Sequence, residues 1–278
     1  MSHPALVPGR VAVVTGGASG IGLGFAKRLA QRGMRICLAD VDEEKLGRAR
    51  DEVAALAANG AEDVVTSVVD VSQRGDLERL QDEVYRAFGE VGLLMNNAAA
   101  FRLGGAYRDQ EAWETTFAVN LMGVVHGLQV FVPRMIEQDT ACLIINTGSK
   151  QGITNPPGIP NYNAAKAAVK SLTESLQHEL RNLEGCQVSA HLLVPGWTTT
   201  GDREHHPSSW LPEQVADWLI AGLGKGDFYI LCPDNEVTPE MDRKRILWGA
   251  MDMTENRPPL SRWHPDYSEQ FEAFEPRR

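Results

Sequence analysis

Short apolar runs alternate with longer amphipathic stretches along most of this chain. Each run has the length of a β-strand and carries Val, Ile and Leu at consecutive positions. This pattern is typical of strands covered on both faces, as in a parallel sheet. The runs span residues 11–15, 35–39, 64–69, 93–96, 142–146, 188–194 and 228–232.

The stretches between these runs carry apolar residues at helical spacing. Ile21, Phe25 and Leu29 recur on one helical face, and Gly33 is placed to end that helix. Comparable patterns cover residues 42–59, 76–88, 111–137, 162–183 and 212–223. Strand and helix in alternation predict a doubly wound α/β fold of the Rossmann type, with helices on both faces of a parallel sheet. Since no linker or repeat interrupts the pattern, residues 1–278 are expected to form a single domain.

The tail from about residue 255 to residue 278 departs from this alternation. It is rich in proline and aromatic residues, including Pro258, Pro259, Trp263, Tyr267 and Phe271. Two interpretations stay open for the tail: it packs on a neighbouring subunit, or it frays.

The composition disfavours several classes of protein. With 43% hydrophobic residues among 278, the chain has enough apolar material for a large core. The formal net charge of −10, without a basic stripe, argues against a nucleic-acid partner. Residues 1–9 lack the pattern of a secretory signal, and no apolar run approaches the ~18 residues of a membrane span. A protein without a membrane partner is therefore expected.

The four cysteines are widely scattered, without a CxxC pair or a Cys/His cluster, so they predict neither a disulfide framework nor a zinc site. They are Cys37, Cys142, Cys186 and Cys232. Three of them lie in apolar runs and are expected to be core thiols in a reducing, cytoplasmic compartment. The adjacent pair His205-His206 has no carboxylate cluster beside it, and neighbouring residues rarely chelate one ion. No metal site is predicted.

A glycine-rich turn, Thr15-Gly-Gly-Ala-Ser-Gly-Ile-Gly22, follows the first predicted strand and opens the first helix. Glycine permits a tight turn and lets backbone N–H groups approach a pyrophosphate at the positive end of the helix. The spacing is GxxxGxG rather than the GxGxxG of the general fingerprint. Its place between strand and helix nevertheless predicts a dinucleotide site. The site would be formed by Gly16, Ser19, Gly20, Ile21 and Gly22.

Polar residues at the ends of the next strands extend this site. Asp40 ends the second strand, where a carboxylate can accept hydrogen bonds from both ribose hydroxyls and repel a 2′-phosphate, so NAD is expected in preference to NADP. Capping the following helix is the alternative role, although Asp42 could fill it. Asp70-Val71 and Asn96-Asn97-Ala98 end the third and fourth strands and are expected beside the adenine and ribose. For Asp70, capping the next helix is again an alternative.

Tyr162 and Lys166 lie four positions apart in a predicted helix, so their side chains share one face. A phenol beside an ammonium group loses its proton more readily and can exchange a proton with an alcohol or carbonyl. Ser149 would donate a hydrogen bond to the substrate oxygen and hold it beside Tyr162. Two alternatives exist for Ser149: it simply ends its strand in a turn, or it forms a Ser/Lys hydrolase with Lys150. The hydrolase is disfavoured because the sequence has no GxSxG elbow there.

Together these motifs resemble the short-chain dehydrogenases/reductases over roughly residues 10–235. Two further matches complete the order, Asn120 and Pro195-Gly-Trp-Thr-Thr-Thr200. The resemblance implies a seven-stranded parallel sheet and a nicotinamide-dependent oxidoreductase. It also implies a catalytic tetrad, which would consist of Asn120, Ser149, Tyr162 and Lys166.

The resemblance also implies roles for residues whose spacing alone shows none. Asn97, Gly196 and Thr198 would help to hold the cofactor, Lys166 would bond its ribose, and Asn120 would fix a water that passes the proton outward. A polar core residue bonded to a neighbour is the alternative for Asn120. One departure from the family is Ala99, where glycine is usual.

The resemblance further suggests a variable substrate loop over about residues 201–215. Many small residues lie in the predicted helices at 111–137 and 162–184, and family members commonly pair through such helices. A homotetramer is therefore expected, with a homodimer as the second possibility.

The predicted reaction is hydride transfer between NAD(H) and a secondary alcohol or ketone. Aromatic residues in loops near the strand ends suggest an apolar or aromatic substrate, with Trp197 as a substrate residue, although such side chains also pack lids. They are Phe101, Tyr107, Trp197 and Trp210. Two other functions remain possible: a catalytically silent NAD-binding regulator or scaffold, and an NAD-dependent isomerase or dehydratase.

Overall fold

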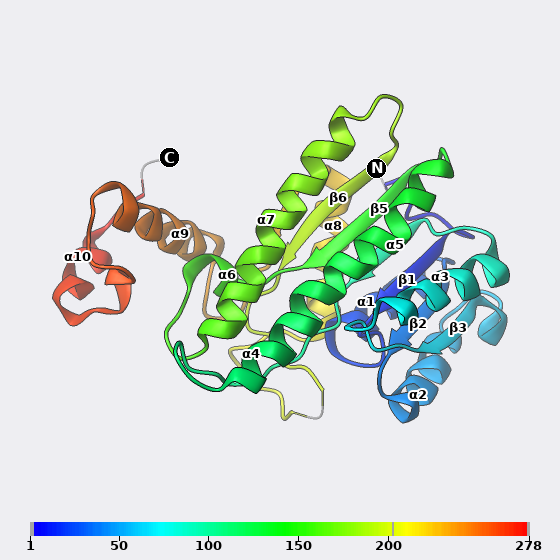
Figure 1. Cartoon of the computed structure of the whole chain (residues 1–278), viewed down its shortest axis with the longest axis horizontal. Coiled ribbons are helices and arrows are strands. Elements are labelled where there is room, and N and C mark those ends of the chain that lie inside the picture. Colours follow the sequence, from blue (N-terminus) through cyan, green and yellow to red (C-terminus); the bar gives the residue numbers. More distant parts are fainter. Residues whose placement is uncertain (1–2, 202, 277–278) are drawn as a thin grey trace.

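The computed structural model describes residues 3–201 and 203–276. Its centre is a sheet of seven parallel strands, which confirms the predicted seven-stranded parallel sheet (Figure 1). The strand order is β3-β2-β1-β4-β5-β6-β7. The strands are β1 Val11–Thr15, β2 Arg35–Asp40, β3 Val64–Val68, β4 Leu93–Asn96, β5 Cys142–Thr147, β6 Val188–Val194 and β7 Tyr229–Leu231. Each agrees with its predicted run to within one residue at either end.

Successive residues of each strand point to opposite faces of the sheet. Both faces are buried in the inner strands, whereas the edge strands β3 and β7 are partly exposed. In β1, Ala12 and Val14 belong to one core, whereas Val11 and Val13 belong to the other. The first core is closed by α1 Gly20–Ala30, α2 Glu43–Ala54 and α8 Pro212–Lys225. The second is closed by α3 Arg74–Phe88, α5 Gly123–Glu137 and α7 Pro160–Asn182. Burial on both sides explains why the strands carry continuous apolar runs.

The predicted helix at 111–137 is interrupted. It consists of α4 Gln110–Phe117, a π-helical turn Ala118–Met122, and α5. By length and composition the stretch Gln110–Glu137 could cross a membrane, although its sequence contains no uninterrupted apolar run of that length. In the fold, α5 packs Val124 and Phe131 into the core beside the sheet, so this stretch serves as a core helix.

The C-terminal arm, defined here as residues 239–276, projects from the main body beside the short helix α6 Gln151–Thr154 (Figure 1). It begins with α9 Pro239–Thr254, which the sequence did not predict, and ends with α10 Ser268–Ala273. The arm folds around Trp248, whose ring meets Phe271 and Phe274 edge-on and whose Nε1 donates to Ser261 Oγ at 2.8 Å. The described part of the tail is therefore folded; residues 277–278 lie outside the described part.

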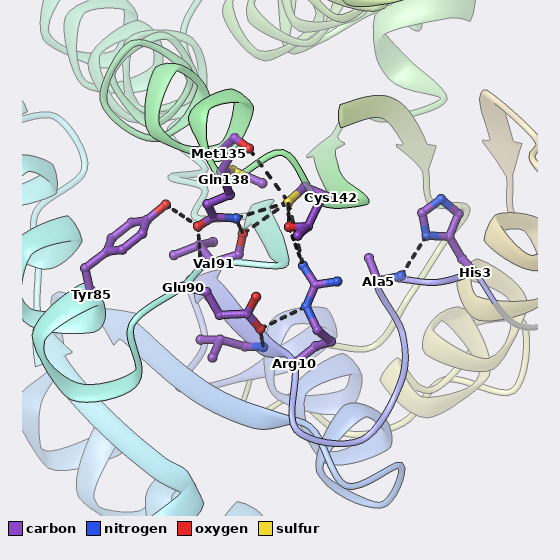
Figure 2. A network of polar contacts seen from close by, with 11 residues as sticks. His3, Ala5, Arg10, Tyr85, Glu90, Val91, Met135, Gln138 and Cys142 are labelled. Carbon is purple, nitrogen blue, oxygen red and sulfur yellow. Dashed lines mark hydrogen bonds and ion pairs between the residues drawn. The ribbon is translucent and has the colours of Figure 1, made fainter. Parts of the chain in front are cut away.

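A polar network braces the amino-terminal ends of β1, β4 and β5 (Figure 2). Arg10 Nε donates to Glu90 Oε1 at 2.8 Å, and the Gln138 amide both accepts from Val91 N and donates to Val91 O. The Cys142 thiol, whose pKa is raised by burial, closes the network. These groups lie at the amino-terminal ends of the strands, whereas the predicted site lies at the carboxyl ends. The network therefore stabilises the sheet without occupying the site.

Candidate active site

A cavity of about 970 Å³ opens at the carboxyl ends of the strands. The cavity includes the space beyond the carboxyl ends of β1 and β4. These two strands are neighbours in the sheet, but the connections that follow them leave in opposite directions. Ligands bind at such a point in doubly wound sheets. Nearly all predicted site residues line it: Gly16, Ser19, Gly20, Ile21, Asp40, Asp70, Val71, Asn97, Ala98, Ser149, Tyr162, Lys166, Gly196, Trp197 and Thr198. Two predicted residues, Gly22 and Asn120, stand behind the cavity wall rather than in it.

The glycine turn has the geometry needed for close approach of a phosphate. Gly16 and Gly20 adopt φ values of +63° and +53°, which side-chain-bearing residues rarely adopt. A Cβ on Gly22 would lie 2.3 Å from Gly16 O, so Gly22 allows the start of α1 to press on the turn. Among the described residues no side chain caps α1. The N–H groups of its first turn are thus available to an anion in the cavity, and these residues fit a dinucleotide pyrophosphate.

Asp40, the last residue of β2, lines the cavity and also braces the glycine turn. Its Oδ2 accepts from Ala18 N at 3.1 Å and its Oδ1 from Asp42 N at 3.2 Å. The cap of α2 is Asp42, whose carboxylate accepts from Lys45 N at 3.0 Å. The helix-cap alternative for Asp40 is therefore wrong. The next residue, Val41, is a largely exposed apolar side chain at the rim.

Asp70 and Val71 follow β3 and reach the same cavity. Asp70 Oδ1 accepts from Ser72 N at 2.9 Å, which forms a local turn, whereas α3 starts at Arg74 after Gln73. Asp70 is therefore not the residue that caps α3. Val71 packs on α5, where a Cβ on Gly123 would lie 2.6 Å from Val71 Cγ2.

Asn97 joins three parts of the site. Its Nδ2 donates to the carbonyls of Thr15 and Gly16 at 3.2 and 3.3 Å, and its Oδ1 accepts from Thr147 Oγ1 at 3.3 Å. The glycine turn after β1 is thereby tied to the ends of β4 and β5. Ala99, which replaces the usual glycine of the resembled family, is exposed and lines the cavity, so its methyl group is accommodated without a clash.

Tyr162 and Lys166 project from the first turns of α7 into the cavity, and Ser149 faces them from the loop after β5. Lys166 is buried, and its Nζ donates to Thr147 O at 2.7 Å. The same Nζ lies 5.7 Å from the centroid of the Tyr162 ring. Ser149 Oγ accepts from Gln151 N at 3.2 Å, which orients the hydroxyl at the start of α6. The predicted trio thus shares one cavity.

Burial dominates the electrostatics of this trio. It lowers the pKa of Lys166 to about 8 and raises the pKa of the Tyr162 phenol, while a hydrogen bond with Ser149 acts in the opposite direction on Tyr162. From the sequence, we expect Lys166 to supply part of a lowering of the phenol's pKa and a positively charged nicotinamide ring to supply more. Among the protein's own groups, desolvation of the phenolate is the largest influence and outweighs the hydrogen bond with Ser149, so the pKa of Tyr162 is raised.

Two buried asparagines hold the turn that carries Tyr162. Asn161 Nδ2 donates to Arg102 O at 2.8 Å and to Thr116 Oγ1 at 2.9 Å, so it links α7 to α4 and the preceding loop. Asn163 Nδ2 donates to Asn155 Oδ1 at 2.9 Å and to Pro156 O at 2.7 Å. The sequence argument missed both residues, although two asparagines directly flanking a tyrosine at the start of a helix were visible.

Asn120 lies in the π-helical turn between α4 and α5, where Gly123 N donates to Ala118 O. Its side chain is fully buried and makes a reciprocal pair with Ala100: Nδ2 donates to the Ala100 carbonyl at 2.8 Å, and Oδ1 accepts from Ala100 N at 2.7 Å. Asn120 thus fixes the loop after β4, as the alternative interpretation had it. The π turn contains one residue more than an α-helical turn, and this directs the Asn120 amide toward the loop at Ala100. Such turns often occur at functional sites.

Two of the four predicted aromatic residues line the cavity. Phe101 contacts the Tyr162 ring edge-on at 5.4 Å between centroids, and Trp197 stacks on His206 at 4.4 Å. Tyr107 points to solvent, and Trp210 packs beside the α1–α8 core. Those two are therefore not part of the wall of the cavity.

The segment after β6 folds back over the glycine turn. Trp210 N donates to Trp197 O and Thr199 N to Trp210 O, which closes the base of the predicted substrate loop. Thr200 reaches Gly20, where a Cβ would lie 3.1 Å from its side chain. Residue 202, inside this loop, lies outside the described residues.

Three charged residues near the cavity were not predicted as a group. Lys150 follows Ser149 and lines the cavity, and it pairs with Asp234 and Asp242 from distant parts of the chain. Only Lys150 carried a sequence signal, its position beside Ser149. The two aspartates lie in segments without any motif.

Comparison with known proteins yields one family. The model of the short chain dehydrogenase family matches residues 10–208. The 1-deoxy-11-beta-hydroxypentalenate dehydrogenase of Streptomyces exfoliatus is 30% identical over 91% of this chain and 94% of its own. A short chain dehydrogenase/reductase from Burkholderia phymatum, solved in complex with NAD, is 34% identical, with a TM-score of 0.81 over 91% of this chain and 96% of its own. A metagenomic short-chain oxidoreductase in complex with NADP is 30% identical, with a TM-score of 0.67 over 82% of this chain and 98% of its own.

Proposed function

The chain belongs to the short-chain dehydrogenase family and is an oxidoreductase, and we propose that it oxidises a secondary alcohol with NAD or reduces the corresponding ketone with NADH. One observation carries this proposal. Ser149, Tyr162 and Lys166 line the same cavity as the glycine turn and Asp40. A group that exchanges a proton with the substrate oxygen is thus next to a site suited to a nicotinamide dinucleotide.

The protein's own residues handle the proton and the orientation of the substrate. Ser149 donates a hydrogen bond to the substrate oxygen, and Tyr162 exchanges the hydroxyl proton with it. Lys166, held by Thr147 O, would favour the phenolate form through its charge and would bond the ribose of a bound cofactor. A bound nicotinamide supplies the acceptor or donor of the hydride at the carbinol carbon. Asn120 keeps the loop at Ala100 in place and thereby the wall beside Tyr162.

Asp40 supports NAD as the cofactor. Its carboxylate lies in the cavity beyond β2, where it would accept hydrogen bonds from ribose hydroxyls and repel a 2′-phosphate. The exposed Val41 beside it supplies no compensating positive charge.

We propose an apolar or aromatic substrate. Phe101 and Trp197, each about half exposed, line the cavity with Tyr162 and would cover an uncharged ring or chain. Gly196 and Thr198, which also line the cavity, would lie beside the bound cofactor.

The proposal is tested by mixing the protein with NAD or NADP and a panel of secondary alcohols that includes 1-phenylethanol and cyclohexanol. Absorbance of the reduced nicotinamide is followed, and the reverse reaction is measured with NADH and the matching ketones. Turnover with an aryl or alicyclic alcohol and NAD supports the proposal. If no alcohol or ketone is turned over, a catalytically silent regulator or an isomerase would be the better assignment.

We further propose a cytoplasmic homotetramer, with a homodimer as the alternative. The edge strand β7 and the adjoining α8 carry the partly exposed Tyr229 and Trp218, which suit contact with a second copy. The four cysteines are free thiols, as expected of a reducing compartment. Light scattering during gel filtration measures the mass, which is 30.5 kDa for one chain.

A further inference from the structure

Lys150, Asp234 and Asp242 form a buried charged cluster at the substrate side of the cavity. Lys150 Nζ lies 2.7 Å from Asp242 Oδ2 and 3.7 Å from Asp234 Oδ2. The side chains of both aspartates are 5% exposed, and that of Lys150 is 14% exposed. Arg245, one turn along α9, also acts on Asp242 by its charge. Groups this well buried interact strongly because little water screens them.

Each member of the cluster is attached to a different part of the site. Lys150 directly follows Ser149 and is the N-cap residue of α6. Asp234 Oδ2 accepts from Trp197 N at 3.0 Å, while its Oδ1 accepts from Val237 N at 2.7 Å. A Cβ on Gly196 would lie 2.7 Å from Asp234 Oδ2, so this carboxylate needs glycine at that position to reach Trp197.

The third member connects the C-terminal arm. Asp242 lies in the first turn of α9, after the Thr238 cap, and is 4% exposed. The helix α9 packs beside α6 at this point. The contact with Lys150 is thus an anchor that joins the start of the arm to the loop carrying Ser149.

We propose that Lys150 is a positioning residue, which through Asp234 and Asp242 holds the Ser149 loop, the Trp197 segment and the C-terminal arm in one arrangement. This inference rests on the proposed function, since its consequence is the fit of the alcohol between Ser149 and Trp197. Lys150 lines the cavity, but its Nζ is directed to the two aspartates, so its role is to position these segments. The arm, which lies outside the strand-and-helix alternation, thereby shapes the substrate side of the site.

The charges in the cluster decide which variants are informative. Lys150→Met leaves two buried carboxylates facing one another and is expected to destabilise the fold. Asp242→Asn is nearly isosteric and leaves Lys150 beside Asp234 as a balanced pair, so this variant should fold. Asp252→Asn is the matched control: the Asp252 side chain, also in α9, is 11% exposed and pairs with Arg257 at 3.2 Å, but it belongs to the core of the arm.

Two measurements are made on the full chain: steady-state kinetics with NAD and 1-phenylethanol, or the best alcohol of the panel, and hydrogen–deuterium exchange of the backbone. Asp242→Asn is expected to raise KM for the alcohol about tenfold, with kcat and NADH binding much less affected. Lys150→Met should raise KM for the alcohol further. The double variant Lys150→Met/Asp242→Asn should recover part of that loss, because it has one unpaired carboxylate fewer. Amides in 195–200 and 239–246 should exchange faster in Asp242→Asn, whereas Asp252→Asn should accelerate exchange only within 248–262 and leave KM unchanged.

The inference is overturned if Asp242→Asn keeps both the KM for the alcohol and the exchange of residues 195–200 at wild-type values. It is also overturned if Asp252→Asn changes both quantities as much as Asp242→Asn does, since general damage to the arm would then explain the effect. Failure of the proposed function has a different signature, no turnover of any alcohol by the unmodified protein. In that case exchange at residues 195–200 still decides whether the cluster couples the arm to the cavity.

Discussion

The Nζ atom of Lys166 lies 5.7 Å from the centroid of the Tyr162 ring while it donates a hydrogen bond of 2.7 Å to Thr147 O. The lysine is therefore held by the end of β5 rather than by the phenol. Lys166 therefore acts on Tyr162 only as a nearby charge. The position of that charge is set by the hydrogen bond to Thr147 at the end of β5. Predictions about the two residues can thus be made separately.

Replacing Tyr162 with Phe removes the hydroxyl to which we assign proton exchange and little else, because the ring and its contact with Phe101 stay. Turnover of the alcohol should fall by about two to four orders of magnitude, with NADH affinity close to that of the wild type. Steady-state assays and fluorescence titration with NADH measure the two quantities. Substantial residual turnover would contradict the assigned role of Tyr162.

The buried Lys166 makes stability depend on pH. Its pKa is about 8 in the folded protein against 10.5 for the ordinary side chain. Between these values the unfolded chain binds a proton that the folded protein has released, so this group makes the free energy of unfolding rise with pH. The difference in unfolding free energy between wild type and Lys166→Met should increase by about 2 kcal/mol from pH 7.5 to 9.5.

Urea unfolding of both proteins at several pH values measures that difference. Comparing the two proteins matters because the pKa values of Cys37, Cys142 and Tyr162 are raised by burial, which lowers stability at alkaline pH in both. A difference that stays constant with pH would mean that Lys166 titrates normally.

Substitutions of Asp40 separate its charge from its hydrogen bonds. Asp40→Asn keeps an oxygen that can accept from Ala18 N, whereas Asp40→Ala loses both the charge and this acceptor. Both variants should lower the preference for NAD over NADP by about tenfold, or about 1.4 kcal/mol, and only Asp40→Ala should also lose about 1 kcal/mol of stability. Ratios of kcat/KM for the two cofactors and thermal unfolding test this. An unchanged cofactor ratio in both variants would refute the assignment of Asp40.

Two glycine substitutions should act in opposite directions. In Gly22→Ala the new Cβ would lie 2.3 Å from Gly16 O, so the glycine turn must open and NADH binding should be lost. In Gly47→Ala, in the middle of α2, the Cβ meets nothing within 4 Å and should add about 0.5–1 kcal/mol of stability. Calorimetric titration with NADH and thermal melts compare the two. Retained NADH binding by Gly22→Ala would show that the turn tolerates the movement.

Asn161→Ala should harm both stability and turnover. The buried acceptor Thr116 Oγ1 and the partly buried Arg102 O would lose their donor, at a cost of about 2 kcal/mol, and the first turn of α7 with Tyr162 would loosen. Asn182→Ala, at the exposed end of the same helix, should change stability by less than about 0.5 kcal/mol. Chemical unfolding and kcat are measured for both. Equal effects of the two substitutions would mean that Asn161 does not hold the turn.

Much of the fold was accessible from local patterns. The strands at 11–15, 93–96 and 188–194 begin and end where their apolar runs do. A parallel strand that is buried on both faces is apolar at consecutive positions, so such a strand can be recognised in the sequence as a short apolar run. The same holds for the glycine turn, because its backbone conformation and the start of α1 are local properties.

Local patterns did not reveal the helix α9 or the break before α5. The apolar residues of α9 do not form a single stripe, since Trp248 faces the arm's core while Asp242 faces Lys150. The π turn at Asn120 adds one residue to a helical turn, which a helical repeat in the sequence does not register. The effect of burial on the pKa of Tyr162 was likewise not accessible from local patterns, because burial depends on the whole cavity.

The sequence by itself determined the sheet, and it predicted a dinucleotide site and the group Ser149, Tyr162 and Lys166 beside it. These predictions follow from short-range spacing, from the resemblance to the family and from the rule that parallel strands end at one edge. Only the tertiary structure decided which residues support them. Asn161 reaches Arg102 and Thr116, and Lys150 reaches Asp242, across long stretches of chain. Such contacts arise when distant segments pack together, and the physical reason that they escape the sequence is that no local periodicity encodes them.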